Sequence, residues 1–133
     1  RTGFAKGAFA MDGLPPVETN VKLYQGWFDQ TLPAFLEANP GPVAFLHMDA
    51  DLYSSTKTVL DALGGRLRPG SVIQFDEYFN YPGWRRGEFQ AFEELVEQHG
   101  IEYEVLGYCD GPMTFEQASF RILRIADSQT SEN

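Results

Sequence analysis

Two pairs of acidic residues stand at the ends of short apolar runs in this chain. Asp49 and Asp51 come shortly after one run, and Asp76 and Glu77 come directly after the next. Apolar runs of this length, bounded by Pro and Gly, are typical of strands buried in a parallel sheet. In open α/β sheets, ligands bind outside the carboxyl ends of the strands. We therefore expect these carboxylates to converge on one crevice.

Carboxylates held close together raise one another's pKa unless a cation lies among them. Oxygen ligands suit Mg²⁺ or Ca²⁺ better than zinc, and the chain shows no His-rich or Cys-rich spacing. The pattern therefore predicts a site for a hard divalent metal. The alternative is that the acids stabilise helix N-termini, as Asp51 would do ahead of Ser54 and Ser55. Because two acidic pairs stand at equivalent strand ends, we favour the metal site over the stabilisation of helix N-termini.

Three other features near predicted strand ends are candidates for binding. His47 precedes the acids, and we expect a core histidine with its hydrogen bonds satisfied, with a role beside the acids as the alternative. Trp27 follows Gly26, where an indole would either pack or lie against a flat ring, and both interpretations stay open. The aromatic stretch 78–84 follows the second acidic pair directly, which favours a pocket lining over a packed loop.

The elements that must position these residues alternate along the chain. Periodicity and turn signals predict a strand at 21–24, helices at 27–38, from about 54, and at 86–98, and strands at 43–48, 71–76, 103–108 and 119–125. The order is β-α-β-α-β-α-β-β, which is typical of an α/β, Rossmann-like half-sheet closed by an antiparallel hairpin. Residues 1–20 are expected to form a loop or lid, and residues 127–133 a frayed tail.

The composition limits the classes of function. With 133 residues the chain is expected to form a single domain, 1–133. Its net charge of −9 and the lack of a basic cluster exclude nucleic acid as the expected partner and favour a cation. One cysteine excludes a disulfide within the chain. No signal peptide or membrane-spanning run is visible, so a cytoplasmic location without a membrane partner is expected.

Several of these residues also form blocks that resemble a known family. The blocks are Val21 to Phe28, Thr31-Leu32-Pro33, His47 to Tyr53, and Phe75 to Tyr78 with Gly83 and Phe89. Over about residues 6–125 the chain is similar to the macrocin O-methyltransferases, a family of S-adenosylmethionine-dependent enzymes whose relatives include sugar O-methyltransferases of antibiotic biosynthesis.

The resemblance implies a class I methyltransferase fold in which Mg²⁺ holds the hydroxyls of a small, sugar-like or natural-product acceptor. Carried over by position, Asp49, Asp76 and Glu77 would be the metal ligands and Asp51 the general base. The family usually has a second Asp where Glu77 stands.

The resemblance also implies where S-adenosylmethionine would lie. Its adenine side would meet Gly26 and Trp27. Folds of this kind hold the rest of the cofactor at a Gly-rich loop after the first strand, and no G-x-G-x-x-G occurs in this chain. The chain begins with Arg1, and we expect it to be an excerpt that starts after the second strand of the class I fold, with the cofactor-loop strands absent.

Two functions follow from that expectation. The first is a Mg²⁺-dependent O-methyltransferase, of which this chain alone would be an inactive portion. The alternative is a non-catalytic fragment that keeps the fold and the metal site and works by binding or assembly. Exposed strand edges would in either case favour a homo-oligomer.

Overall fold

A computed structural model describes residues 12–109 and 116–126. Residues 1–11 of the loop or lid expected at 1–20, and the tail expected at 127–133, lie outside the described residues, while residues 12–20 form neither a helix nor a strand. The elements in chain order are α1 (Phe28–Ala38), β1 (Phe45–Met48), α2 (Tyr53–Leu63), β2 (Val72–Phe75), α3 (Glu88–His99), β3 (Ile101–Tyr108) and β4 (Ala118–Ile125). Short 3₁₀ turns follow α2 at Gly64–Arg66 and precede α3 at Trp84–Arg86.

The strands form one mixed sheet in the order β1-β2-β4-β3. β1 and β2 are parallel, with Phe45 opposite Val72 and Met48 opposite Phe75. β4 runs antiparallel to both β2 and β3. The predicted α/β sheet closed by an antiparallel hairpin is therefore confirmed.

The strand predicted at 21–24 is wrong, because these residues form neither a helix nor a strand. Val21, Leu23 and Tyr24 are exposed, and the ring of Tyr24 packs edge-on against Phe35 of α1. A short run of this kind becomes a strand only where a neighbouring strand offers hydrogen-bonding partners. The described order is consequently α-β-α-β-α-β-β.

The predicted helices are confirmed, with small shifts at their ends. α1 begins at Phe28 and runs through Pro33. α2 begins at Tyr53, after an N-cap at Leu52 that makes no side-chain cap bond, so Ser54 and Ser55 lie inside the helix and do not cap it. α3 ends at Gly100, whose left-handed backbone (φ 58°) closes the helix before β3.

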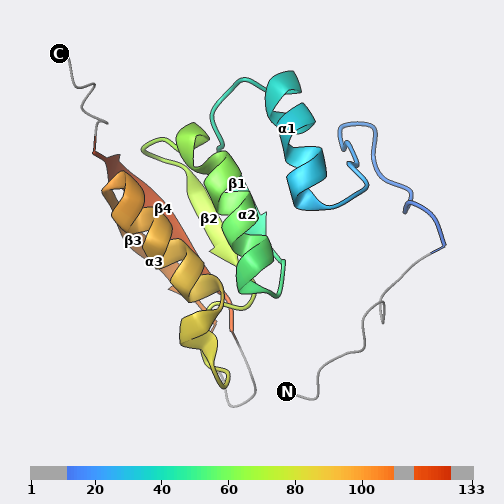
Figure 1. The fold of residues 1–133 in the computed structure, drawn as a ribbon. Helices are drawn as coiled ribbons and strands as arrows, with labels where there is room; N and C mark the ends of the chain where they lie inside the picture. Colours follow the sequence, from blue (N-terminus) through green and yellow to red (C-terminus); the bar gives the residue numbers. More distant parts are fainter. Residues whose placement is uncertain (1–11, 110–115, 127–133) are drawn as a thin grey trace.

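The core lies between one face of the sheet and the helices α2 and α3, which lie side by side over that face (Figure 1). Phe75 of β2 is fully buried at the centre of an aromatic cluster, with ring centroids 5.2 Å from Phe92, 5.3 Å from Tyr78 and 6.0 Å from Phe120. This packing fixes where β2 ends, and therefore where Asp76 begins.

The same cluster corrects the interpretation of the aromatic stretch 78–84. Tyr78 is buried against Phe89 and Phe120, and burial raises the pKa of its phenol far above the usual range. Trp84 packs edge-on against Phe89 at 4.8 Å. These two aromatic side chains pack onto the core, because α3 offers an apolar surface directly beside them, and this packing supports the alternative of a packed loop.

The opposite face of the sheet is open over the described residues. Phe45 of β1 and Leu123 of β4 point away from the helices and are exposed, and β1 pairs with β2 on one side only. Among the described helices, none is long and apolar enough to cross a membrane.

Candidate functional site

The acidic residues meet at the carboxyl ends of the two parallel strands. Met48 and Phe75 are paired across β1 and β2, and the next residues along each strand are Asp49 and Asp76. The backbone N–H of Asp76 donates to the carbonyl of Met48 at 2.9 Å. The ladder therefore places the backbones of Asp49 and Asp76 next to each other at one edge of the sheet.

The four predicted acids differ in how accessible they are. Asp49 and Asp51 are exposed, and the side chain of Asp76 is 31% exposed. Glu77 is only 9% exposed, so its side chain is directed into the protein. Among residues 12–109 and 116–126, no three His, Cys, Asp or Glu side chains form a group arranged to hold a metal ion. The predicted set of Asp49, Asp76 and Glu77 is therefore not preassembled.

Within residues 12–109 and 116–126, the side chains of Gln117 and His47 approach the carboxylate of Asp76. Gln117 Nε2 donates to Asp76 Oδ1 at 2.7 Å, and His47 Nε2 lies 3.7 Å from the same oxygen. The side chain of His47 is 45% exposed, which shows that the expected core histidine is wrong. His47 faces away from the helices because it alternates with Met48, whose side chain enters the core.

Asp51 lies in a tight turn between β1 and α2. The backbone N–H of Leu52 donates to the carbonyl of Ala50 at 2.6 Å, which makes Asp51 the central residue of a three-residue turn. Its φ of 61° is in the left-handed region, where residues other than glycine are strained. Asp51 does not cap α2, whose N-cap is Leu52. The alternative in which Asp51 is a helix cap is thus wrong.

A fifth carboxylate, Glu88, lies under this edge and was missed by sequence reasoning. Glu88 is the first residue of α3, is fully buried, and accepts a hydrogen bond from the backbone N–H of Glu77 at 2.9 Å. A signal was available, because Glu88 occupies the same helical stripe as Phe92 and Leu95, where a core residue is expected.

The surroundings of Glu88 raise the pKa of its carboxyl group well above the ordinary value for glutamate. The pKa of Glu88 is raised from 4.5 to about 7, chiefly by burial and to a lesser extent by the charges of Asp76 and Asp49, while the backbone amides of Glu77 and Ala50 act in the opposite direction. Glu88 therefore lies close enough to Asp49 and Asp76 to experience their charges.

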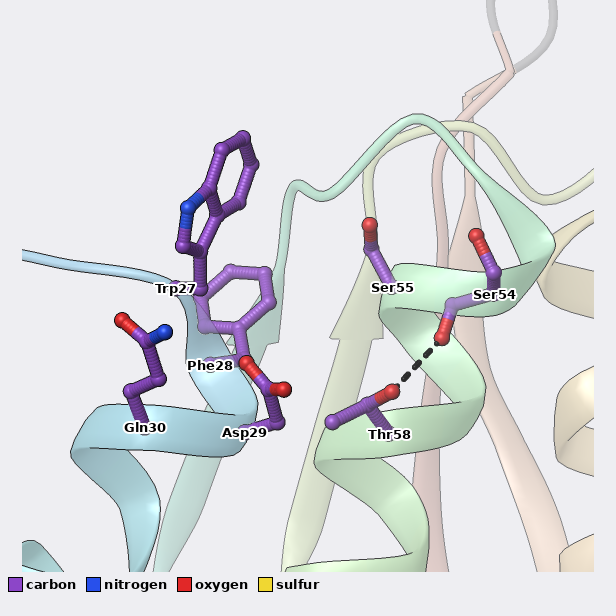
Figure 2. Close-up of a pocket in the computed structure, with 7 residues that line it drawn as sticks. All are labelled: Trp27, Phe28, Asp29, Gln30, Ser54, Ser55 and Thr58. Atoms are coloured by element: carbon purple, nitrogen blue, oxygen red, sulfur yellow. Dashed lines mark hydrogen bonds between the residues drawn. The ribbon is translucent and has the colours of Figure 1, made fainter.

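A pocket of about 310 Å³ lies close to the acids, between the first turns of α1 and α2. Its lining consists of Trp27, Phe28, Asp29, Gln30, Ser54, Ser55 and Thr58. In Figure 2, Asp29 and Thr58 face each other across the gap between the two helices, while the indole of Trp27 extends outward at the rim. The pocket adjoins the turn of Asp51, because Ser54 and Ser55 belong to the first turn of α2.

Gly26 and Trp27, the predicted cofactor residues, lie where α1 begins. Trp27 is 68% exposed and contributes to the pocket. Gly26 has a φ of 138°, and a Cβ atom there would lie 3.0 Å from Thr31 Cγ2. Glycine at position 26 therefore lets the chain turn into α1 and leaves the indole of the next residue outside the helix.

The mixed sheet and its helices match part of the fold of solved O-methyltransferase structures. The apo structure of a TDP-rhamnose 3′-O-methyltransferase of calicheamicin biosynthesis matches with a TM-score of 0.55 and 31% identity, over 73% of this chain and 39% of that one. The O-methyltransferase NovP matches with a TM-score of 0.53 and 27% identity, over 74% of this chain and 36% of that one.

The profile of the macrocin-O-methyltransferase (TylF) family matches residues 6–114, and the chain belongs to this family of S-adenosylmethionine-dependent O-methyltransferases. Mycinamicin III 3″-O-methyltransferase of Micromonospora griseorubida is 33% identical over 90 residues, which cover 68% of this chain and 32% of the relative. A 4′-O-methyltransferase of a dimethoxyrhamnosyl-tetracenomycin from Streptomyces olivaceus is 39% identical over 62 residues, or 47% of this chain and 23% of the relative. The chain thus spans about a quarter to a third of the length of these relatives.

Proposed function

We propose that this chain carries the metal- and acceptor-binding part of a Mg²⁺-dependent O-methyltransferase that methylates a hydroxyl of a sugar-like or natural-product acceptor. The observation that carries the proposal is the pair of accessible carboxylates, Asp49 and Asp76, at adjacent ends of parallel strands. The names of the relatives support the acceptor class, since they act on a rhamnosyl-tetracenomycin, on mycinamicin III and on demethyldecarbamoylnovobiocin.

The donor set of this edge fits magnesium. Mg²⁺ keeps several waters and is usually held by one or two carboxylates together with substrate oxygens, so a protein cage of three or more ligands is not required. In this proposal Asp49 and Asp76 hold the ion. The side chain of Glu77 is buried, so Glu77 would become a third ligand only if this side chain turned outward when the metal binds. When bound, the ion would lower the pKa of the acceptor hydroxyl.

Asp51 is the general base of the proposal. Its carboxylate is exposed two residues after Asp49, on a turn that keeps it out of both β1 and α2. It would accept the hydroxyl proton as the acceptor oxygen forms a bond to the methyl carbon of the sulfonium, while the bond from that carbon to sulfur breaks. The strained backbone at Asp51 agrees with a position set by function, because such strain concentrates at active sites.

Gly26 and Trp27 would form the adenine side of the S-adenosylmethionine site. The exposed indole of Trp27 offers a flat apolar surface at the rim of the pocket, and the pocket adjoins the turn that carries Asp51. A cationic methyl donor would also be favoured by the net charge of −9.

A second candidate function is supported by one observation. The chain contains no G-x-G-x-x-G, and the described residues before β1 form no strand that such a loop could follow. A non-catalytic module that binds metal and takes part in assembly would need neither the Gly-rich loop nor the strand that precedes it.

The experiment uses the full-length protein encoded with this sequence, S-adenosylmethionine with a labelled methyl group, and TDP-rhamnose as the acceptor. We expect methyl transfer that EDTA abolishes and that added Mg²⁺ restores. Transfer that is unaffected by EDTA would contradict the metal in this proposal. A protein that binds Mg²⁺ but transfers no methyl group to any sugar-bearing acceptor would favour the assembly module.

A further inference from the structure

The turn that carries Asp76 is held by the segment that enters β4. Gln117 immediately precedes β4, and its Nε2 donates to Asp76 Oδ1 at 2.7 Å. Glu116, one residue earlier, accepts two backbone hydrogen bonds through its carbonyl, from Tyr78 at 2.8 Å and from Phe79 at 3.3 Å. The side chain of Asp76 and the backbone that follows it are thus fixed by two consecutive residues that lie about 40 positions further along the chain.

The amide of Gln117 has a defined orientation. Its Oε1 lies 3.4 Å from Cys109 Sγ, whose thiol donates to it, and its Nε2 faces the carboxylate of Asp76. An ionised carboxylate only accepts hydrogen bonds, and an amide oxygen only accepts as well, so the flipped amide would place two acceptors together. The backbone N–H of Cys109 also donates to the carbonyl of Gln117 at 3.0 Å, which ties β3 to the same point.

We propose that Gln117 is a positioning residue for the metal site, because it holds the carboxylate of Asp76 in the orientation that binds Mg²⁺. The inference rests on the proposed function, in which Asp76 is a metal ligand. Gln117 donates to Oδ1, so this bond leaves the second carboxylate oxygen, Oδ2, unused. The side chain of Asp76 is 31% exposed, and His47 Nε2, at 3.7 Å from Oδ1, is too far away for a hydrogen bond. Without the bond from Gln117, the carboxylate would therefore be less firmly oriented before the metal arrives.

Gln117→Leu tests this inference, since leucine keeps the bulk of the side chain and removes the amide. We expect the affinity for Mg²⁺, measured by titration calorimetry on the 133-residue chain, to fall by about 10- to 100-fold, the range typical of ligand-orienting neighbours. Gln117→Asn serves as a second variant, because it keeps an amide that is one methylene too short to reach Asp76. Gln117→Asn should therefore also weaken the binding of Mg²⁺.

Gln90→Leu is the matched control. Gln90 of α3 donates from its Nε2 to Glu94 Oε1 at 2.9 Å, the same kind of bond away from the acidic edge. This variant should bind Mg²⁺ like the wild type, and all variants should keep the circular dichroism spectrum of the wild type. Unchanged Mg²⁺ affinity in both Gln117 variants, or an equal loss in Gln90→Leu, would overturn the positioning role and leave the proposed function intact. A folded wild type that binds no Mg²⁺ would overturn both.

Discussion

Asp51 is the residue on which proton transfer in the proposed reaction depends. Asparagine at this position keeps the shape of the side chain but cannot accept a proton. Asp51→Asn in the full-length enzyme should therefore lower turnover by roughly 10²–10⁴-fold, the usual loss for a general base. The affinity for Mg²⁺ should stay close to that of the wild type.

Asp61→Asn is the control for Asp51→Asn, since Asp61 is an exposed carboxylate of α2 that pairs with Lys57. It should leave turnover unchanged. Turnover close to the wild-type value in Asp51→Asn, measured by transfer of a labelled methyl group, would remove Asp51 from the role of base.

Glu88 provides a test of the electrostatics beneath the acidic edge. Its pKa in the folded chain is about 7, above its ordinary value of 4.5, so the folded state binds the proton more tightly than the unfolded state. The stability that Glu88 contributes is therefore complete below about pH 4.5, decreases as the pH rises, and is lost above about pH 7.

Glu88→Gln should remove this dependence on pH, because glutamine stays neutral and can still accept the bond from the amide of Glu77. Between pH 5 and pH 8, the free energy of unfolding of the wild type relative to the variant should fall by about 2.5 kcal/mol. Urea denaturation in EDTA measures both proteins at both pH values. A constant difference between the two proteins across this range would show that the carboxyl of Glu88 titrates normally.

The sequence allowed the prediction of some of these residues and not of others. Asp49 and Asp76 could be found because each follows an apolar run, and the strand register then places them together. The burial of Glu77 could not be predicted, since it depends on how the start of α3 packs under the turn after β2, whereas the helical stripe of Phe92 and Leu95 gave a signal for Glu88 that was overlooked. His47 was misjudged because its neighbour Met48, and not His47, enters the core.

At the scale of the elements, periodicity predicted α1, α2 and α3 because each has an apolar stripe that meets the core or its margin. The strand predicted at 21–24 failed because a strand exists only with a partner, and local sequence does not reveal whether one is present. The hairpin of β3 and β4 was predictable since its two strands follow each other in the sequence, and β4 alternates between buried and more exposed residues over most of its length.

The open face of the sheet is a surface on which this chain should self-associate. Phe45, on the edge strand β1, is 59% exposed, and Leu123 of β4 is also exposed on that face. Exposed apolar side chains beside an unpaired strand edge favour pairing with another chain. We expect sedimentation velocity to show concentration-dependent oligomers of the 133-residue chain.

Phe45→Lys should shift this equilibrium toward the monomer, because it places a charge on the edge strand. Arg124→Lys, on an exposed position of β4 that is already charged, is the control and should sediment like the wild type. A wild type that is monomeric at every concentration would contradict the expectation.

At the scale of the whole molecule, the chain alone should not bind S-adenosylmethionine measurably. It offers the pocket at Trp27 for the adenine side, but its sequence contains no G-x-G-x-x-G motif to hold the methionine and ribose moieties. Equilibrium dialysis with labelled cofactor measures this directly. Micromolar binding by the 133 residues would mean that the cofactor site lies elsewhere in the chain.

The central claim is that the edge formed by the ends of β1 and β2 is a site for a divalent metal. Titration calorimetry with Mg²⁺ on the wild type and on Asp76→Asn tests it most directly, with circular dichroism to confirm that both proteins are folded. We predict that the wild type binds Mg²⁺ and that Asp76→Asn loses this binding, because the substitution removes a charged ligand while keeping the size of the side chain. Equal binding by the two proteins, or no binding by a folded wild type, would contradict the claim.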